Sequence, residues 1–381
     1  MGAPSLLACR PEGHRPLRAL AQPSDLFRDF GPNWYAAVMG TSITATAGFT
    51  LPVHLPGIAT GSTALWALSV LMLLGVGGAR TVHLLRHRDR ARAQLLDPGM
   101  APFYGCLSMA LMSVGAATLI IGQRVIGTSA AVGVDTALWL AGTVIGVLVM
   151  VVVPALMLTR YDADERTLYP TWLLPVVALY VSASLGPLLL PHLPDGQWRA
   201  AMLILCCAML GMVMLATLMM LPVIWARLLR HSLGPAHMAP TLFLVLGPLG
   251  QSVTAVAKIA DLAKGTLPEP YATGLRGMAM VYGVPVLGAA LFWILLSGAL
   301  VLRTARRGMP FALTWWAFTF PLGTCVTGAT AVAQHTHLAA ARWLAAGLYA
   351  LLTALWTLVA VRTARAAWTG RAFLPPQTAR T

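Results

Sequence analysis

Charged residues are scarce in this chain. Asp, Glu, Lys and Arg make up 10% of its 381 residues, whereas a soluble domain typically carries about 25%. With so few charges the chain cannot cover itself with a water-facing surface, which excludes an ordinary soluble fold. The chain has 12 acidic residues against 26 Lys and Arg, a positive balance that is also found in nucleic-acid-binding proteins. Here, however, the arginines gather at the ends of apolar segments. We therefore predict no nucleic-acid partner.

Cysteines and catalytic motifs are also few. The five cysteines show neither a pairing pattern nor metal-ligand spacing. Four lie in apolar segments and are interpreted as small apolar side chains: Cys106, Cys206, Cys207 and Cys325. The sequence lacks a His-Glu-x-x-His metal motif, a nucleophile elbow and an Asp-rich diphosphate site. We predict that the protein is not an enzyme and that it uses no cofactor and no metal.

Long apolar runs are what the chain has in abundance. Hydrophobic residues make up 58% of it, in ten runs of about 20 residues, the length that a bilayer core of about 30 Å requires. The runs cover residues 32–50, 63–82, 101–122, 135–159, 170–190, 199–226, 240–262, 276–302, 310–332 and 340–362. They lack the alternation of barrel strands, so helices must satisfy the backbone in lipid. The sequence predicts an all-α polytopic membrane protein, with ten transmembrane helices in a domain at 31–365 between polar tails at 1–30 and 366–381.

Arginines mark one side of the predicted bundle. They follow the second, fourth, sixth, eighth and tenth runs; the eighth, for example, is followed by Arg303, Arg306 and Arg307. The N-terminal tail holds further arginines. The opposite loops hold fewer basic residues: Arg124, Arg199, Lys258, Lys264, Arg276 and Arg342. By the positive-inside rule both termini, and so both tails, are predicted to be cytoplasmic. We expect a multi-pass protein in the lipid bilayer of a bacterial inner (plasma) membrane.

Proline recurs at the start of every odd-numbered run. The five positions are spaced by 68 to 70 residues: Pro32, Pro102, Pro170, Pro240 and Pro310. Proline suits the first helical position because its missing N–H is not needed there. Chance alone can align two or three such prolines, but five in register indicate a repeat. Five helical hairpins most simply close into a ring, with one helix of each pair inside and one outside.

Hydroxyl-bearing and small residues concentrate in the odd-numbered runs, whereas the even-numbered runs are mostly Leu, Val, Ala and Met. Such residues suit either close helix packing or a polar path, and both readings stay open for any single residue. The segregation by helix favours a path. The predicted pore-lining residues are Gly40, Thr41, Ser42, Ser108, Ser184, Gly247, Gln251, Ser252, Thr319 and Thr324.

Prolines also occur within the odd-numbered runs. Pro187, Pro248 and Pro321 are predicted to kink their helices and to free backbone carbonyls. Broken helices at membrane depth are tolerated where they line a water-filled cavity. These kinks therefore favour the same path.

Charge inside the runs is nearly absent, and no Asp or Glu lies near the centre of any of them. Lys258 and Asp261, three residues apart near the outer end of the seventh run, are expected to pair. A proton-coupled carrier usually keeps a buried carboxylate or histidine as its relay. The candidates, Asp261, His335 and His337, all lie near the outer rim, which favours a channel-like path.

Three strings resemble the tellurite-resistance/dicarboxylate transporter family, which includes plant slow anion channels and fungal malate and sulfite transporters. The strings are WYAAVMGT from Trp34, GPLGQ from Gly247 and WWAFTFP from Trp315. Ser42 departs from the family pattern, in which a second glycine is common at this position, and this affects the expected pore width or selectivity. The resemblance covers nearly the whole chain. It implies five helical hairpins around a central pore, usually in a homotrimer with one pore per subunit.

The resemblance also implies that a phenylalanine of the ninth run plugs the pore. Phe320 aligns best with this position, and Phe318 is the second choice. An aromatic ring in a narrow pore blocks hydrated ions sterically and by dewetting.

Transport of small anions through a gated central pore is therefore the predicted function. Sulfite, C4-dicarboxylates, tellurite-type oxyanions, halide and nitrate all remain open as substrates. A proton-coupled C4-dicarboxylate carrier is the first alternative. A membrane scaffold without its own flux and an intramembrane enzyme are the alternatives from other classes.

Overall fold

The computed structural model describes residues 16–20, 22–53, 56–160 and 165–374. Cys9 and most of the predicted N-terminal tail lie outside these ranges, as does the predicted C-terminal tail beyond residue 374. The described part is helical, and its only β-type pairing is a single bridge between Lys264 and Leu267. An all-helical protein is what the apolar runs predict.

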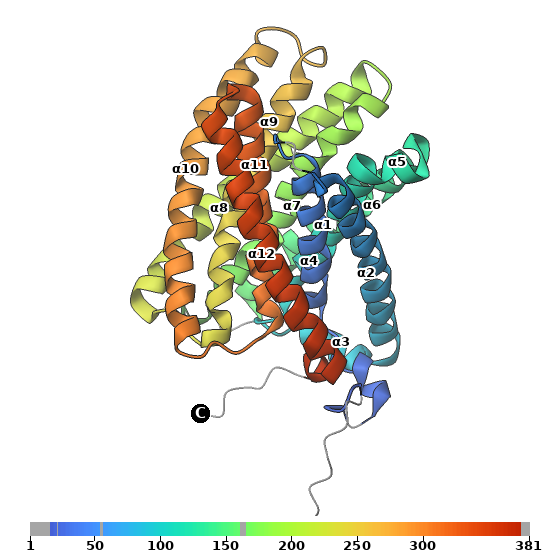
Figure 1. Cartoon of the computed structure of the whole chain (residues 1–381), viewed down its shortest axis with the longest axis vertical. Helices are drawn as coiled ribbons and strands as arrows, with labels where there is room; N and C mark the ends of the chain where they lie inside the picture. Colours follow the sequence, from blue (N-terminus) through green and yellow to red (C-terminus); the bar gives the residue numbers. More distant parts are fainter. Residues whose placement is uncertain (1–15, 21, 54–55, 161–164, 375–381) are drawn as a thin grey trace, which may run out of the picture.

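Five long helices form the outer layer of the bundle. They are α2 (Ile58–Arg86), α6 (Thr128–Thr159), α8 (Gln197–His231), α10 (Tyr271–Arg306) and α12 (Ala339–Thr369). Figure 1 shows α10 and α12 running along most of the height of the molecule. In their most apolar windows only 17–33% of the residues are buried within the protein. Their remaining leucines and valines suit contact with lipid, which accepts such side chains without cost.

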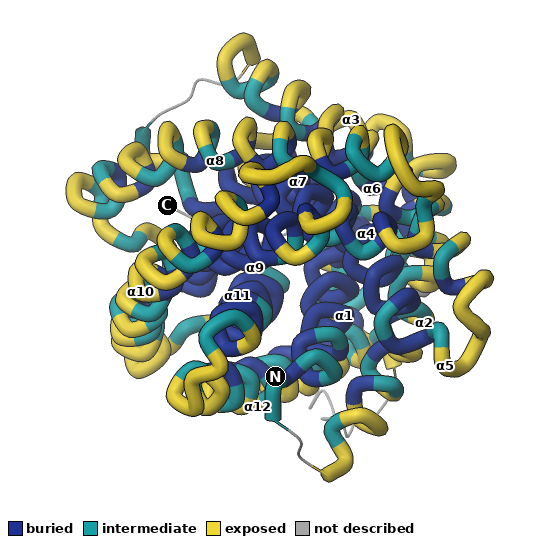
Figure 2. The backbone as a smooth tube through the Cα atoms, turned by 90° about the horizontal axis from the view of Figure 1, so that it is seen from above, coloured by how far each residue is buried: buried dark blue, intermediate teal, exposed yellow. Residues whose placement is uncertain are grey.

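Five shorter helices form the inner layer. They are α1 (Tyr35–Phe49), α4 (Tyr104–Ala117), α7 (Leu174–Leu185), α9 (Leu246–Ala263) and α11 (Phe320–Thr336). Each contacts the next in this order, and α11 contacts α1, so the inner helices close a ring. Figure 2 shows these helices in the buried colour, with the exposed colour on the outer ones. The odd-numbered runs of the sequence are thus the buried ones.

Each outer helix bridges two inner helices. α2 follows α1 in the chain, contacts it closely and also contacts α4, the next inner helix. The same holds around the ring, where α12 contacts both α11 and α1. The 68- to 70-residue repeat of the sequence therefore corresponds to a repeated packing unit of one inner and one outer helix.

Among the described residues, eight helical segments are long and apolar enough to cross a membrane. Five are the outer helices, and three are the inner segments Ala101–Ile126, Pro170–His192 and Ala236–Ala263. The inner helices α1, with 15 residues, and α11, with 17, fall outside this set. The sequence predicts ten spans, so these two helices account for the difference. Both are short and rich in threonine and glycine, and most of their residues are buried within the protein.

A 3₁₀ turn precedes every inner α-helix. The turns are η2 (Pro32–Trp34), η3 (Ala101–Phe103), η6 (Pro170–Leu173), η8 (Ala236–Val245) and η9 (Leu313–Phe318). The repeating proline lies in the first turn of η2, η3 and η6, as predicted for a helix start. Pro240 instead lies inside η8, and Pro310 precedes η9 by three residues. Because the 3₁₀ turns differ in length, regularly spaced prolines do not all occupy the same position in their turns.

The described part of the N-terminal tail packs on the end of α12. The backbone N–H of Leu17 donates to the Trp368 carbonyl, at 2.8 Å. The Phe373 ring stacks on Phe30 and on Trp34, with ring centroids 6.3 and 5.1 Å apart. The first and last described segments therefore lie at the same end of the bundle.

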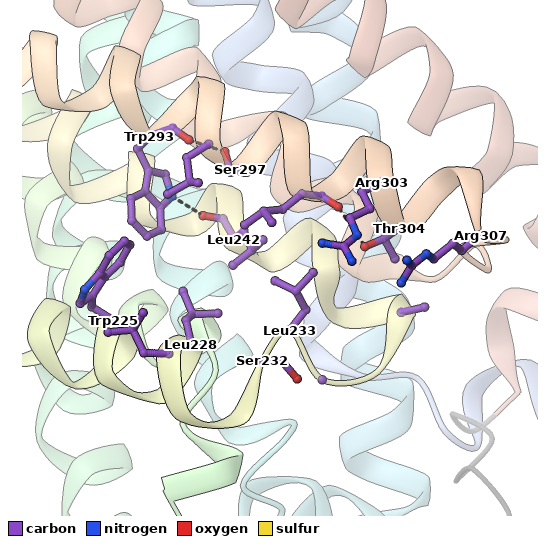
Figure 3. A pocket seen from close by; sticks show the side chains of 15 residues that line it. Trp225, Leu228, Ser232, Leu233, Leu242, Trp293, Ser297, Arg303, Thr304 and Arg307 are labelled. Carbon is purple, nitrogen blue, oxygen red and sulfur yellow. Dashed lines mark hydrogen bonds between the residues drawn. The ribbon is translucent and has the colours of Figure 1, made fainter.

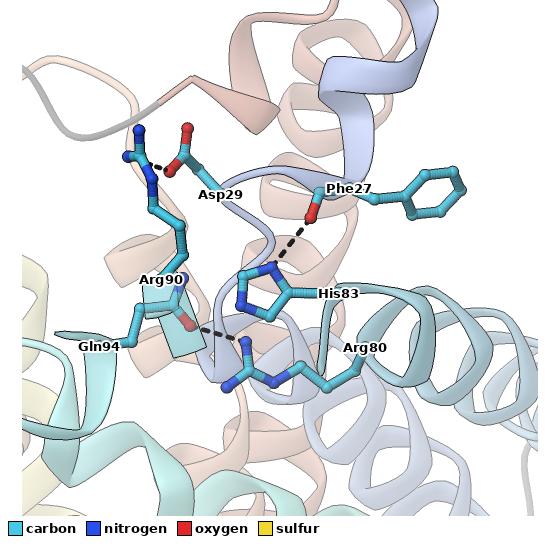
Figure 4. Close-up of polar contacts among 6 residues, drawn as sticks. All are labelled: Phe27, Asp29, Arg80, His83, Arg90 and Gln94. Carbon is cyan, nitrogen blue, oxygen red and sulfur yellow. Dashed lines mark hydrogen bonds and ion pairs between the residues drawn. The ribbon is translucent and has the colours of Figure 1, made fainter. Parts of the chain in front are cut away.

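Two basic side chains of α2 hold the same tail (Figure 4). The buried Arg80 guanidinium donates to the Phe30 carbonyl and to Gln94 Oε1, each at 2.6 Å. His83 Nδ1 donates to the Phe27 carbonyl at 2.9 Å. Arg80, the first basic residue after the second run, thus stabilises the fold instead of facing water.

Candidate functional site

A cavity of about 120 Å³ lies inside the inner ring. All five inner segments line it. The lining residues are Ile43, Thr46, Thr50, Ser113, Ala116, Ile120, Val181, Ser184, Leu185, Leu188, Gln251, Thr254, Lys258, Phe320, Thr327, Thr330, Ala331 and Gln334. Most of them lie in the later parts of their helices. The cavity therefore occupies the end of the bundle opposite the docked N-terminal tail.

Nine of the 18 residues that line the cavity are uncharged and polar, set among apolar side chains. The Gln251 amide nitrogen donates to Ser184 Oγ, which joins α9 to α7. The hydroxyls of Thr254 and Thr327 lie 2.8 Å apart and join α9 to α11. The Gln251 Oε1 atom is buried without a hydrogen-bond partner in the described structure. A wall of hydroxyl and amide dipoles can solvate a small ion without binding it as tightly as a fixed opposite charge would.

Lys258 is the one charged side chain among the described residues that line the cavity. It is half-buried and lies on the same face of α9 as Gln251 and Thr254, towards the end of the helix. Gln334, at a similar level on α11, is exposed, so the cavity opens to solvent at this end. A cation at the mouth raises the local concentration of anions.

The predicted pair between Lys258 and Asp261 does not form. The Asp261 carboxylate instead lies 3.0 Å from His335 Nε2 on α11. The neighbouring helix offers Asp261 a partner at its own level, whereas the Lys258 side chain turns towards the cavity. Lys258 therefore keeps its charge available at the mouth.

Phe320 forms the inner end of the cavity. Its side chain is 2% exposed, and it is the first residue of α11. The next lining residue of α11 is Thr327, seven positions further on, which is roughly 10 Å along a helix axis. No earlier described residue of α11 or η9 lines the cavity. Phe320 thus lies at the depth where the cavity closes.

Phe318 occupies a different environment. Its ring meets Phe243 edge-on, with centroids 5.0 Å apart, and Trp315 at 6.0 Å. It is 3% exposed and does not line the cavity. These contacts join η9 to η8, so Phe318 packs the layer below the cavity.

Of the ten predicted pore-lining residues, Ser184 and Gln251 lie on the cavity wall. Three of the others, Thr41, Ser108 and Ser252, bond to outer helices. Thr41 Oγ1 accepts a hydrogen bond from Trp356 Nε1 of α12, at 3.0 Å. Ser108 Oγ donates to the Gly142 carbonyl of α6, at 2.6 Å. Both hydroxyls therefore join an inner helix to an outer one.

Two more predicted serines are also engaged between helices. Ser42 Oγ donates to the Ser113 carbonyl, at 2.8 Å, which joins α1 to α4. Ser252 Oγ accepts from the Tyr282 hydroxyl of α10, also at 2.8 Å. Serine is small enough to let the backbones approach while it satisfies a polar group on the neighbour.

The remaining predicted residues lie at close helix contacts. A methyl group on Gly40 would collide with the Thr319 hydroxyl, and one on Gly247 would touch Val177 at 3.4 Å. Thr324 Oγ1 donates to a backbone carbonyl of the α9 segment at 3.2 Å. Gly40, Thr319 and Thr324 thus lie where inner helices approach closely, whereas Gly247 has room for a methyl group.

The three predicted kink prolines each lie where the helix changes type. Pro187 lies in the 3₁₀ segment η7 (Gly186–His192), which continues α7. Pro248 lies in the first turn of α9, directly after η8. Pro321 is the second residue of α11 and follows a break at Thr319 between η9 and α11. The break places the Phe320 side chain at the start of a new helix, against the cavity.

Asp135 is a buried acidic group that sequence reasoning missed. It is 1% exposed, and neither carboxylate oxygen has a hydrogen-bond partner in the described structure. It lies in the first third of α6 behind α4, where a methyl group on Gly115 would come within 2.6 Å of it. The predicted run began at this residue, which placed it at the membrane edge. The available signal was a lone acid in a 32-residue helix that is otherwise uncharged.

These features define a class. A multi-pass helical membrane protein whose inner helices enclose a small cavity, lined in part by hydroxyl and amide groups and with a cation at its mouth, has the features of a transport protein for small anions. A model of the voltage-dependent anion channel family matches residues 29–364. The chain belongs to this family.

The names of similar proteins agree with that class. An uncharacterized transporter of Methanocaldococcus jannaschii is 26% identical over 359 residues, which cover 94% of this chain and 99% of the relative. A sulfite efflux pump of Trichophyton rubrum is 26% identical over 341 residues, covering 87% of this chain and 89% of the relative. A sulfite efflux pump of Candida albicans is 24% identical over 326 residues. All three relatives are named as transport proteins, and none as an enzyme.

Proposed function

We propose that this protein exports sulfite, or a small inorganic anion like it, along a path enclosed by the five inner helices and closed at Phe320. The observation that carries the proposal is the cavity, because all five inner segments line it and a single aromatic ring lies at its inner end.

The proposal requires α1 and α11 to cross the membrane as well, which makes ten spans in five hairpins. Both helices belong to the closed inner ring and contribute to the cavity wall. A span that is shielded from lipid by other helices need not meet the hydropathy of a lipid-facing one, and polar residues are tolerated where they line a cavity. Their shortness and their polar residues are therefore compatible with spanning.

The chemistry of the wall favours anions. Lys258 supplies one positive charge at the mouth, and none of the described lining residues is an Asp or Glu. Selectivity would come from width and from hydroxyl and amide donors, as in pores without a fixed charge at their centre. Phe320 would block the path until its side chain rotates away.

Sulfite is preferred on two grounds. Two of the relatives above are named as sulfite efflux pumps. A cavity of about 120 Å³ is also well below the 300–1,000 Å³ of pockets that hold larger organic ligands. A proton-coupled C4-dicarboxylate carrier has less support, because the wall offers a single cation for two carboxylates and holds no carboxylate of its own.

Export is proposed because two of the relatives are named as efflux pumps, and the proposed orientation is compatible with it. The arginine-rich end, where the described tail segments dock, would face the cytoplasm. The cavity would then open to the outside, and Phe320 would separate it from the cytoplasm. The homotrimer implied by the family resemblance belongs to the proposal as well.

A flux assay in proteoliposomes tests the function. Vesicles are loaded with sulfite, and its release is measured for the wild-type protein and for Phe320→Ala, because a closed gate keeps wild-type flux low. We expect release above that of protein-free vesicles, with chloride and nitrate as weaker competitors and malate weaker still. If the flux of malate exceeded that of sulfite, malate would replace sulfite as the proposed substrate. Absence of anion flux in both proteins would refute transport.

A further inference from the structure

A second and larger cavity, of about 540 Å³, lies on the outside of the bundle between α8 and α10. It opens between two outer helices whose exposed faces are apolar, so its opening faces the lipid. It is separate from the central cavity and shares none of its lining residues. We refer to it as the α8–α10 groove.

One end of the groove is apolar and aromatic (Figure 3). Trp225 of α8 and Trp293 of α10 stand there with ring centroids 5.9 Å apart. Trp293 is fixed in place because its Nε1 donates to the Leu242 carbonyl of η8, at 2.8 Å. Leucines of α8 and α10 continue the wall from the tryptophans: Leu228, Leu229, Leu296 and Leu300.

The other end of the groove carries positive charge. Arg303 and Arg307 extend from the end of α10, beside Thr304 (Figure 3). Both are exposed, and neither forms an ion pair with any residue of the described chain. Two cations at the end of an apolar groove thus lack an anionic partner within the part of the chain that the structure describes.

The length of the groove matches half a bilayer. Trp293 and Arg303 are ten residues apart on one helix, which is roughly 15 Å along its axis. One leaflet contributes about 15 Å to a hydrocarbon core of about 30 Å. An acyl chain whose end reaches the tryptophans would therefore place its headgroup at the arginines.

We propose that the α8–α10 groove is a binding site for an anionic phospholipid. One acyl chain lies along the leucines towards Trp225 and Trp293, and the headgroup phosphate is held by Arg303 and Arg307. Basic pockets between membrane helices on the cytoplasmic side are suited to anionic headgroups, and arginine binds phosphate in a bidentate geometry. A second copy of this chain suits the groove less well, because the two arginines would need carboxylates opposite them on a surface that is poor in acidic residues.

Native mass spectrometry of the full-length protein in detergent tests the site. Palmitoyl-oleoyl phosphatidylglycerol is added in competition with phosphatidylcholine that carries the same chains. We expect wild-type protein to retain the anionic lipid preferentially, by about thirtyfold, since each of the two arginines contributes about 1 kcal/mol near a lipid surface. The Arg303→Gln/Arg307→Gln double variant should lose this preference.

Arg306→Gln is the matched control. Arg306 lies on the same turn of α10 and is exposed, but it does not line the groove. This variant should keep the preference. An equal loss in Arg306→Gln, or equal retention of both lipids by the wild type, would overturn the proposal.

Two further experiments distinguish an anionic lipid from other occupants of the groove. Leu300→Trp fills the groove and should reduce binding of both lipids without changing the oligomeric mass. A change of oligomeric mass with unchanged lipid binding would instead make the groove an interface between copies. Glycerophosphoglycerol, which is the headgroup without acyl chains, should not compete with the lipid. Full competition by it would refute the acyl-chain part of the site.

Discussion

The inner and the outer helices of this protein carry different residues because they have different neighbours. In the most apolar windows of the outer helices, 17–33% of the residues are buried, whereas 83–89% are buried in the three inner segments that qualify as spans. Outer helices meet lipid on most of their surface and therefore consist of large apolar side chains. Inner helices meet other helices and the cavity, so they can carry hydroxyls, glycines and breaks.

Glycine shows the same contrast. On α9, a methyl group on Gly250 would lie 2.5 Å from backbone atoms of Thr324 and Cys325, whereas one on Gly211 of the outer helix α8 would meet nothing within 4 Å. Inner glycines thus set the distance between helices, and most outer ones do not. Gly142 and Gly146 of α6, which pack against α4 and α7, and Gly283 of α10, which packs against α9, are exceptions.

The largest expected effect comes from a side chain placed between inner helices. Gly250→Leu should separate α9 from α11 and cost more than about 3 kcal/mol of stability, because backbone atoms cannot move aside as a flexible side chain would. We expect little or no monodisperse protein in size-exclusion chromatography. Gly211→Leu, the matched outer variant, should behave as wild type. Equal behaviour of the two variants would remove the contrast between the layers.

The next effect concerns charge at the mouth of the cavity. Lys258→Gln should lower anion flux by about three- to tenfold at low ionic strength, because the cation no longer concentrates anions there. The loss should shrink as salt rises. Lys264→Gln removes the same charge from an exposed position at the end of α9 that does not line the cavity. Its flux should stay near the wild-type value, and a loss as large as that of Lys258→Gln would argue against a local role.

A smaller effect separates hydroxyls on the wall from those behind it. Thr327→Val should lower flux by about two- to fivefold, since it removes one wall dipole and the hydrogen bond to Thr254. Thr41→Val should leave flux unchanged but cost about 1 kcal/mol of stability, because Trp356 loses its hydrogen-bond acceptor. Flux in proteoliposomes and thermal unfolding in detergent measure the two outcomes. The reverse pattern would mean that the path runs between the inner and outer layers.

The positions of the helices could be read from the sequence, because bilayer thickness and lipid contact constrain composition directly. The predicted run 199–226 lies within α8, and 276–302 lies within α10. The helices extend beyond the predicted runs because their polar ends continue past the hydrocarbon region, where hydropathy gives no signal. The buried position of the odd-numbered runs was readable for the same reason, since lipid does not favour their hydroxyls and glycines.

The sequence could not predict the direction in which each side chain of the inner helices points. Thr41 and Thr46 are five residues apart on α1, which turns their side chains to different sides of the helix. Thr46 lines the cavity, while Thr41 bonds Trp356 of α12. A hydroxyl is equally useful as a packing group and as a wall group, so composition does not separate the two roles. Helix rotation depends on long-range contacts such as the one between Ser42 and the Ser113 carbonyl.

The two phenylalanines of the ninth run give the most direct test of the proposed path. Phe320 lies at the closed end of the cavity, whereas Phe318, two residues away, packs against Phe243 and Trp315. Anion conductance of Phe320→Ala and Phe318→Ala would be compared in planar bilayers at equal amounts of folded protein. We predict a rise of at least about tenfold over wild type for Phe320→Ala, because the ring that excludes hydrated ions is gone, and no rise for Phe318→Ala. Unchanged conductance in a folded Phe320→Ala protein, or an equal rise in both variants, would contradict a path closed at Phe320.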